Sequence, residues 1–371
     1  MIVRFEDVIT RVTGNVDRYN TDLEYYVGGD QYDSSALTIE RKGNLKKDVD
    51  ILGFKFHFPF KSGDVLLMAR NPHLRKAGQV FFDGLCSDAS YILRTLDSNV
   101  LLQDFIPILL QRDHFWDFFE SHKTGGITFL MNWGMLKTYE FDLPPIDKQR
   151  EIMEKVWAAY RLKQSYQKLI EATDELVKSR FIEVFGDVSI ERRLGDVSAI
   201  VSGKTIDLEK ENEGGPIAYL KVADMNLPEN DRVVSTSSRF VSEATARTSG
   251  IIPIGATIFP KNGAAALHNK KRITAVSTCV DMNTMAVYSS TDELLPEFLY
   301  AFLASQDIAS LALVGAIPQI RAKDVANLSI PLPSKEKQIE YLALVQQADK
   351  SKFELKQAIE KIDKVMRALM Q

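Results

Sequence analysis

Leu143-Pro144-Pro145-Ile146-Asp147-Lys148-Gln149 recurs 189 positions later in the chain as Leu332-Pro333-Ser334-Lys335-Glu336-Lys337-Gln338. Each copy ends a short apolar segment, 139–143 or 328–332, that is typical of a β-strand. Proline then stops the strand, and an acidic residue follows where the dipole of a new helix favours negative charge. The sequence therefore predicts a duplicated junction between a strand and a helix.

Both predicted helices carry a stripe of mostly apolar residues at alternating spacings of three and four. Such a stripe is the mark of a coiled-coil seam, and the charged residues between its members indicate solvated faces. Two unrelated amphipathic core helices are the alternative, which the shared register of the two copies disfavours. The stripe residues are Ala159, Leu162, Tyr166, Leu169, Thr173 and Leu176 in the first helix, and Ala348, Ser351, Leu355, Ala358, Ile362, Val365 and Leu369 in the second.

The regions that precede the two helices also resemble each other and predict two α+β domains. Cys86 precedes Cys279 by 193 positions, and both lie in apolar, strand-like surroundings that indicate buried core thiols. Gly186 is a plausible stop for the first long helix. The predicted strands are 30–40, 65–69, 79–85, 216–222, 257–260 and 279–288, and the predicted helical segments are 101–119 and 296–313.

Composition describes a globular protein of two domains, with 371 residues, 45% hydrophobic and 26% charged. The longest apolar runs fall far short of a membrane span, and the first residues do not form a secretory signal. We therefore expect a bacterial or archaeal cytoplasmic protein without a membrane partner. The formal net charge of −4 argues mildly against nucleic-acid binding, so any such contact must come from local groups.

The sequence predicts no catalytic residues. Ser202-Gly203-Lys204-Thr205 resembles the end of a phosphate-binding loop, but Ser198 stands where that loop requires its first glycine. Leu143-Pro144-Pro145-Ile146 lacks the leading amide or acid and the aromatic residue of a nucleobase aminomethyltransferase. The five histidines show no metal-ligand spacing, so no metal site is predicted either.

Each half contains a loop-like stretch, after an equivalent strand, that combines basic and amide side chains. Lysine and arginine position a protein on phosphates, whereas arginine, asparagine and glutamine read base edges. A solvated surface loop is the alternative, but the recurrence in both halves favours DNA contact. The candidates are Arg70, Asn71, Arg75 and Lys76 in the first half, and Lys261, Asn262, Lys270, Lys271 and Arg272 in the second.

A second candidate stretch, 315–324, offers Gln319, Arg321 and Lys323 as base readers or phosphate clamps. Its counterpart, 125–133, lacks the Pro-Gln pair and supplies Asn132 instead. Lys204 completes the set of predicted DNA contacts. The two halves thus share a frame and differ in their recognition surface, which suits a reader of two different half-sites.

In the order of these features the chain resembles the specificity subunit of type I restriction-modification systems. The resemblance covers essentially the whole chain: two variable regions, each followed by a Leu-Pro strand, a glutamine at a helix start and a heptad helix. The motifs that carry it are 26–34 in the first half and 201–205, 219–225 and 317–320 in the second. The first half departs from the family pattern at 128–131, so its DNA contacts are not carried over.

The resemblance implies target recognition domains at 1–146 and 186–331, each binding one half-site of a split target in double-stranded DNA. The helices at 147–185 and 332–371 would pack as an antiparallel coiled coil in a pseudo-twofold arrangement. Methyltransferase subunits, two by expectation, would carry S-adenosylmethionine and methylate adenine N6, and a restriction and translocase subunit would join for cleavage in phage defence. The chain itself would hold no cofactor and no catalytic site.

Two functions of other classes remain open from the residues. The chain could be the remnant of a single-chain methyltransferase or nuclease, against which the missing cofactor loop argues. It could also be a coiled-coil adaptor whose duplicated domains bind protein, in which case DNA affinity would not depend on Arg321 or on Lys270-Lys271-Arg272.

Overall fold

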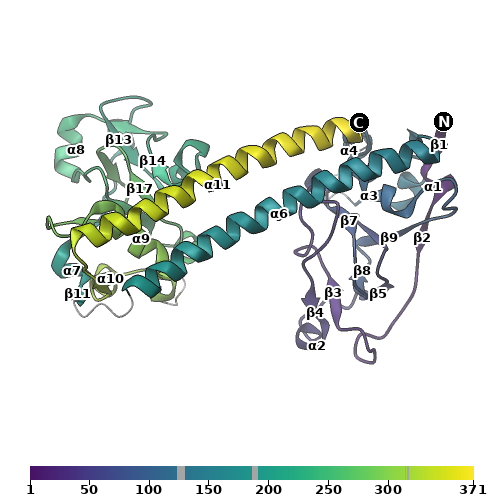
Figure 1. Cartoon of the computed structure of the whole chain (residues 1–371), viewed down its shortest axis with the longest axis horizontal. Helices are drawn as coiled ribbons and strands as arrows, with labels where there is room; N and C mark the ends of the chain where they lie inside the picture. Colours follow the sequence, from purple (N-terminus) through teal and green to yellow (C-terminus); the bar gives the residue numbers. More distant parts are fainter. Residues whose placement is uncertain (123–129, 186–190, 314, 316) are drawn as a thin grey trace. The chain divides into compact units, whose positions relative to one another are not determined.

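The computed structural model describes residues 1–122, 130–185, 191–313, 315 and 317–371. Gly186, the predicted helix stop, and residues 125–129 of the second candidate stretch in the first half lie outside the described residues. The chain forms two compact units, one of residues 1–168 with 355–371 and one of residues 169–354. Each long helix, α6 (Ile146–Phe185) and α11 (Lys335–Met370), contributes one end to each unit (Figure 1).

The first unit contains two four-stranded sheets, of order β2-β9-β6-β7 and β4-β3-β8-β5, and the antiparallel pair β1-β10. The aromatic side chains Phe115, Trp116 and Phe119 of α4 pack in the core with residues of the sheet β2-β9-β6-β7. The strands are β1 (Ile2–Arg4), β2 (Ile9–Val12), β3 (Tyr25–Val27), β4 (Gly43–Asn44), β5 (Phe56–Phe60), β6 (Val65–Met68), β7 (Ala77–Gln79), β8 (Gly84–Ser87), β9 (Ser90–Thr95) and β10 (Glu140–Asp142). The shorter helices are α1 (Phe5–Val8), α2 (Leu45–Asp48), α3 (Ile106–Leu110), α4 (Asp113–Ser121) and α5 (Trp133–Leu136), with 3₁₀ turns η1 (Pro72–Leu74) and η2 (Gln103–Phe105).

The second unit repeats this plan with sheets of order β12-β19-β16-β17-β14 and β15-β13-β18, and the antiparallel pair β11-β20. Phe298 and Phe302 of α9 pack against Phe181 of α6 in its core. The strands are β11 (Glu191–Arg193), β12 (Ser198–Ser202), β13 (Ile217–Leu220), β14 (Val233–Val234), β15 (Phe240–Val241), β16 (Thr257–Pro260), β17 (Arg272–Thr274), β18 (Thr278–Val280), β19 (Thr284–Ser289) and β20 (Ser329–Pro331). The helices are α7 (Leu194–Val197), α8 (Glu243–Ser249), α9 (Pro296–Ser305) and α10 (Ala322–Ala326), with 3₁₀ turns η3 (Leu208–Lys210), η4 (Val222–Asn226), η5 (Pro228–Asn230), η6 (Ala264–His268) and η7 (Ile308–Leu311).

The two cysteines confirm the predicted duplication. Cys86 lies in β8, which pairs in parallel with β3, and Cys279 lies in β18, which pairs in parallel with β13. Both are free and buried. Burial raises the pKa of the Cys86 thiol to about 12 and that of Cys279 to about 11, so both are protonated core side chains, as predicted.

Most of the other predicted segments are confirmed, and three are wrong. Residues 30–40 form turns with one bridge, at Thr38, instead of a strand. Turn-forming Asp and Ser residues dominate there, and Ser35 adopts a left-handed conformation (φ 56°). The predicted strand 79–85 instead contains a bend that separates β7 from β8, which belong to different sheets. The predicted strand 279–288 likewise contains a turn that separates β18 from β19, also in different sheets.

Gln149, the last residue of the first duplicated pattern, is fully buried and joins the start of α6 to the domain before it. Its side-chain oxygen accepts a hydrogen bond from the backbone N–H of Leu102 (3.0 Å). Its Nε2 donates to the carbonyl oxygens of Val100 (2.8 Å) and Pro144 (2.9 Å). One side chain therefore satisfies three backbone groups that no strand or helix ladder pairs.

Gln338 performs the same task in the second unit, where it is also fully buried. It accepts from the N–H of Leu295 (2.9 Å) and donates to the carbonyl oxygens of Glu293 (2.7 Å) and Pro333 (3.0 Å). The glutamine of the repeated pattern is thus a structural clamp, which explains why both copies carry it.

The predicted seam of the first long helix is partly wrong. Leu162, Leu169 and Leu176 are 44%, 50% and 59% exposed. The buried positions of α6 fall instead on another face, at Val156 and Tyr160 in the first unit and at Phe181 and Phe185 in the second. Aromatic side chains bury more apolar area than leucine. The face that carries them therefore packs into the cores of the two units, although its apolar residues are less regularly spaced.

The predicted stripe of α11 is largely confirmed, since Ala348 is buried and Leu355, Ala358, Ile362 and Leu369 are half-buried, while Ser351 and Val365 are exposed. Lys163 pairs with Asp363 in the first unit (2.6 Å). Within the second unit, Asp174 pairs with Lys352 (2.5 Å), and Phe181, further along α6, contacts Tyr341, which is earlier in α11. The two helices therefore run antiparallel there, as the resemblance implied.

Candidate nucleic-acid interface

The two basic stretches after β6 and β16 occupy equivalent places in their units. In the first unit, position 70 forms an antiparallel bridge with position 130, and the Met131 N–H donates to the Ala69 carbonyl (2.7 Å). In the second unit, position 262 bridges position 319, and the Ile320 N–H donates to the Lys261 carbonyl (2.8 Å). The fold thus brings together the two candidate stretches of each half, which lie about 60 residues apart in sequence.

A buried residue anchors each bridge. Met131 and Ile320 directly follow the bridging positions, and both are buried. The hydroxyl of Tyr91 also donates to the Met131 carbonyl (2.7 Å). Because the next side chain is held in the core, the side chains at the bridging positions are presented on a fixed backbone.

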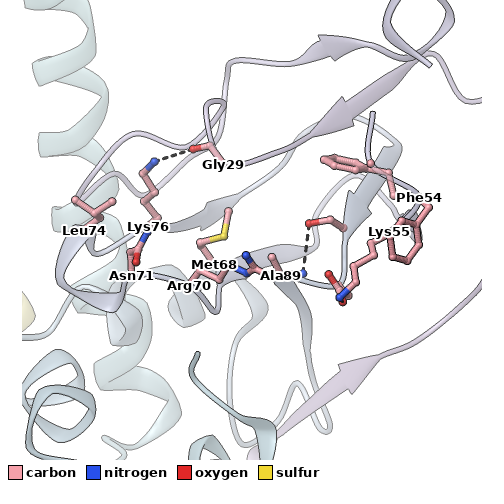
Figure 2. Close-up of a pocket in the computed structure, with 13 residues that line it drawn as sticks. Gly29, Phe54, Lys55, Met68, Arg70, Asn71, Leu74, Lys76 and Ala89 are labelled. Carbon is pink, nitrogen blue, oxygen red and sulfur yellow. Dashed lines mark hydrogen bonds and ion pairs between the residues drawn. The ribbon is translucent and has the colours of Figure 1, made fainter. Parts of the chain in front are cut away.

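In the first unit this place borders an open pocket of about 380 Å³, shown in Figure 2. Lys76 donates to the Gly29 carbonyl (2.7 Å), and Lys55 pairs with Asp88 (2.7 Å). The exposed Arg70 guanidinium has no hydrogen bond or ion pair with any residue that the structure describes. The pocket combines the polar Lys55, Arg70, Asn71 and Lys76 with the apolar Phe54, Phe56, Met68 and Leu74.

Three of the four candidates in this stretch line the pocket, and Arg75 does not. Arg75 turns to Asp113 of α4 (2.5 Å between Nη1 and Oδ1). Asn132 caps α5, its Oδ1 accepting from the Gly134 N–H (2.6 Å). Sequence reasoning missed Lys55, because a single lysine between aromatic residues gives no basic cluster.

In the second unit the structure joins Asn262 and Gln319. The Gln319 Nε2 donates to the Asn262 Oδ1 (3.2 Å), and the Asn262 Nδ2 donates to the Met282 carbonyl and to the Asn283 Oδ1 (3.3 Å each). Gln319 is exposed. These two amides were predicted from separate stretches of sequence.

The basic candidates beside this amide pair differ in whether their charged groups have hydrogen-bond or ion-pair partners. The side chains of Lys261, half-buried, and Lys323, exposed, have no polar partner among the described residues. Arg321 forms a two-point ion pair with Asp324 (2.7 and 3.1 Å). The exposed Lys204 donates to the Thr248 carbonyl (3.3 Å).

Lys270, Lys271 and Arg272 do not form the exposed basic cluster that their sequence suggested. Lys270 donates to the side chain of Asn226. The Arg272 Nε donates to the Asn230 carbonyl (2.6 Å). The Lys271 ammonium is buried and donates to the Gln306 carbonyl (2.8 Å). Lys271 and Arg272 thus satisfy partly buried backbone carbonyls, whereas the contact of Lys270 is exposed.

The similarity to a known family lies in the second half of the chain. Residues 188–364 match the family model described as the type I restriction modification DNA specificity domain. This part of the chain is similar to the DNA specificity domains of type I restriction-modification systems. Comparison with curated proteins gives no match.

Solved structures show the same fold over the whole chain. One, from work on complex assembly and conformational transition of the type I restriction-modification system, has a TM-score of 0.59 at 19% identity and covers 100% of this chain and 96% of the other. The specificity subunit of a type I restriction-modification system from M. genitalium has a TM-score of 0.52 at 15% identity and covers 100% and 95%.

The description of the matched family concerns DNA specificity. In the described parts of the chain, no group of three or more His, Cys, Asp or Glu side chains could hold a metal ion. No described helix combines the length and the apolar character that crossing a membrane requires.

Lys271 supplies a pH-dependent prediction. Burial lowers its pKa from 10.5 to about 8 in the folded protein. Between these values the unfolded chain binds more protons, so the stability contributed by this site rises with pH. We expect the wild type to gain about 1–3 kcal/mol over Lys271→Met between pH 7 and pH 10, measured by urea unfolding of both proteins followed by circular dichroism. An unchanged difference would contradict the prediction.

Proposed function

We propose that this chain is the specificity subunit of a type I restriction-modification system and that it reads a split DNA target with two equivalent surfaces, one in each recognition domain (1–146 and 186–331). The Arg70 surface comprises Lys55, Arg70, Asn71 and Lys76, and the Gln319 surface comprises Lys261, Asn262, Gln319, Arg321 and Lys323. The observation that carries this proposal is that one backbone bridge recurs in both units with different side chains on it. A shared frame with different chemistry is what reading two different half-sites requires.

The proposal leaves out Arg75, which does not line the pocket and pairs with Asp113, and Lys270, Lys271 and Arg272, whose charged groups donate to Asn226, Gln306 and Asn230 away from the bridge. Asn132 and Lys204 are exposed and stay secondary candidates. Since the net charge is −4, binding must depend on the local groups of the two surfaces rather than on the overall field.

The same proposal includes a scaffolding role toward methyltransferase subunits, two by expectation, and a restriction subunit in the cytoplasm. Leu169 and Leu176 support it, since they lie exposed one heptad apart on α6 in the second unit. Exposed leucines at this spacing suit an amphipathic partner helix. S-adenosylmethionine and adenine N6 methylation would belong to the methyltransferase partner.

The test is genome-wide mapping of N6-methyladenine in a host that expresses the partner methyltransferase with or without the specificity subunit. We expect a split motif that appears only with the subunit, together with co-purification of the two proteins. Unchanged methylation by an active, bound methyltransferase would instead favour the protein-binding adaptor.

Removing the two lysines without polar partners, in Lys261→Ala/Lys323→Ala, should weaken binding to all duplexes alike. The logarithm of the DNA-binding constant falls linearly with the logarithm of the salt concentration. Each lysine that contacts a phosphate adds about 1 to the steepness of this fall, so removing it should make the fall shallower by about 1. The measurement is fluorescence anisotropy with target and non-target duplexes over a salt series. Lys210→Ala, which removes an exposed lysine paired with Asp207, is the control. An effect limited to the target duplex would contradict a phosphate role.

A further inference from the structure

We infer that Arg70 reads a guanine in one half-site and that Gln319 reads an adenine in the other. This inference rests on the proposed function and names the bases for those two surfaces. Each part is argued within its own unit.

Arg70 carries hydrogen-bond donors and no acceptor. Its guanidinium is exposed and has no hydrogen-bond or ion-pair partner among the described residues, so the whole planar fork is available. Leu130, its bridge partner, is 52% exposed and apolar, and offers no competing polar group. In the major groove only guanine offers two neighbouring acceptors, N7 and O6, whereas adenine pairs one acceptor with a donor. The Arg70 fork therefore matches guanine.

Gln319 carries one donor group and one acceptor, and its orientation is set by Asn262. The Asn262 Oδ1 accepts from the Gln319 Nε2 at 3.2 Å. A reversed Gln319 amide would place two oxygens against each other, so the hydrogen bond fixes which end is which. The Gln319 oxygen and the second hydrogen of Nε2 then remain for DNA. Adenine offers the complement, a donor at N6 and an acceptor at N7, while guanine would oppose two acceptors.

Asn262 is consequently a positioning residue. Its Nδ2 donates to the Met282 carbonyl and to the Asn283 side chain, so its own amide is also oriented. It acts on DNA through Gln319, and its removal should relax the choice of base more than it weakens binding.

Positions 70 and 262 lie on equivalent bridges, as do 130 and 319. Arg70 therefore corresponds to Asn262, and Gln319 to Leu130, so the two readers stand on opposite members of equivalent bridges. Replacing each reader by the other's side-chain type tests each base assignment within its own half-site.

The experiment maps N6-methyladenine motifs for the wild type, Arg70→Gln and Gln319→Arg, each co-expressed with the partner methyltransferase. The wild-type motif should contain a guanine in one half, which depends on Arg70, and an adenine in the other half, which depends on Gln319. Arg70→Gln should move the first position toward adenine and leave the second half unchanged. Gln319→Arg should move the second position toward guanine and leave the first half unchanged. In both variants the preference between adenine and guanine at the affected position should change by roughly 5- to 150-fold. The unchanged half of each motif shows that the variant is folded and bound.

Asn262→Ala should reduce the preference for adenine over guanine at the second position, because the Gln319 amide then loses the hydrogen bond that orients it. Loss of affinity with an unchanged motif would show that these side chains hold phosphates, and would overturn the inference. A split motif that is insensitive to both exchanges would overturn it as well, while leaving the proposed function intact. The absence of any split motif would overturn both.

Discussion

Gln149→Ala should lower the free energy of unfolding of the first unit by about 3–5 kcal/mol, one of the two largest effects that we expect in this protein. The variant removes three hydrogen bonds and leaves the N–H of Leu102 and the carbonyls of Val100 and Pro144 without partners in a buried place. Each such group costs about 1–3 kcal/mol when water cannot replace the partner. Gln338→Ala should have the same effect in the second unit.

The three tryptophans, Trp116, Trp133 and Trp157, all lie in the first unit, so tryptophan fluorescence during urea unfolding follows that unit. Gln167→Ala is the matched control, because Gln167 is exposed on the same helix, and its effect should stay within about 0.5 kcal/mol. For Gln338→Ala, hydrogen exchange of residues 293–303 gives the local measure. Equal unfolding midpoints for Gln149→Ala and Gln167→Ala would show that the clamp contributes little.

Gly203→Ala should destabilise the second unit by about 3 kcal/mol or more. A Cβ at this position would lie 2.1 Å from the carbonyl oxygen of Asp281 and 2.2 Å from that of Val280. Both neighbours are backbone atoms, so the variant must push the chain apart where the Gly203 N–H donates to the Thr284 carbonyl (3.0 Å). Gly203 therefore serves close backbone packing and not a phosphate-binding loop.

Gly214→Ala is the matched control for this prediction. No atom lies within 4 Å of the Cβ it would add, and its φ is not in the left-handed region. Its effect should be near zero or slightly stabilising, because alanine restricts the unfolded chain. Thermal unfolding by circular dichroism and hydrogen exchange of 278–284 distinguish the variants. A Gly203→Ala protein as stable as Gly214→Ala would contradict the packing argument.

Local sequence patterns predicted the architecture well. Proline after a short strand and an acidic first turn correctly located the start of α6 and α11, and β16 has the predicted bounds. These features depend on neighbours in the chain, so the sequence contains them directly. Residues 30–40 failed because turn-forming side chains outweighed the apolar ones between them.

The seam of the long helices could be predicted only in part. The regular heptad of Leu162, Leu169 and Leu176 is a real pattern, but a pattern cannot show which face meets the core when a helix carries two apolar faces. The aromatic residues of the irregular face, such as Phe181, decide the packing because they find Phe298 and Tyr341 from distant parts of the chain.

By itself the sequence determined the duplication, the strand-to-helix junctions, the buried cysteines and the stretches that carry recognition chemistry. Only the tertiary structure decided which of those side chains face outward. It joined Asn262 to Gln319 and turned Lys271 inward. The physical reason is that a basic side chain donates to whatever oxygens the fold leaves unpaired nearby, and the positions of those oxygens depend on contacts far apart in the chain.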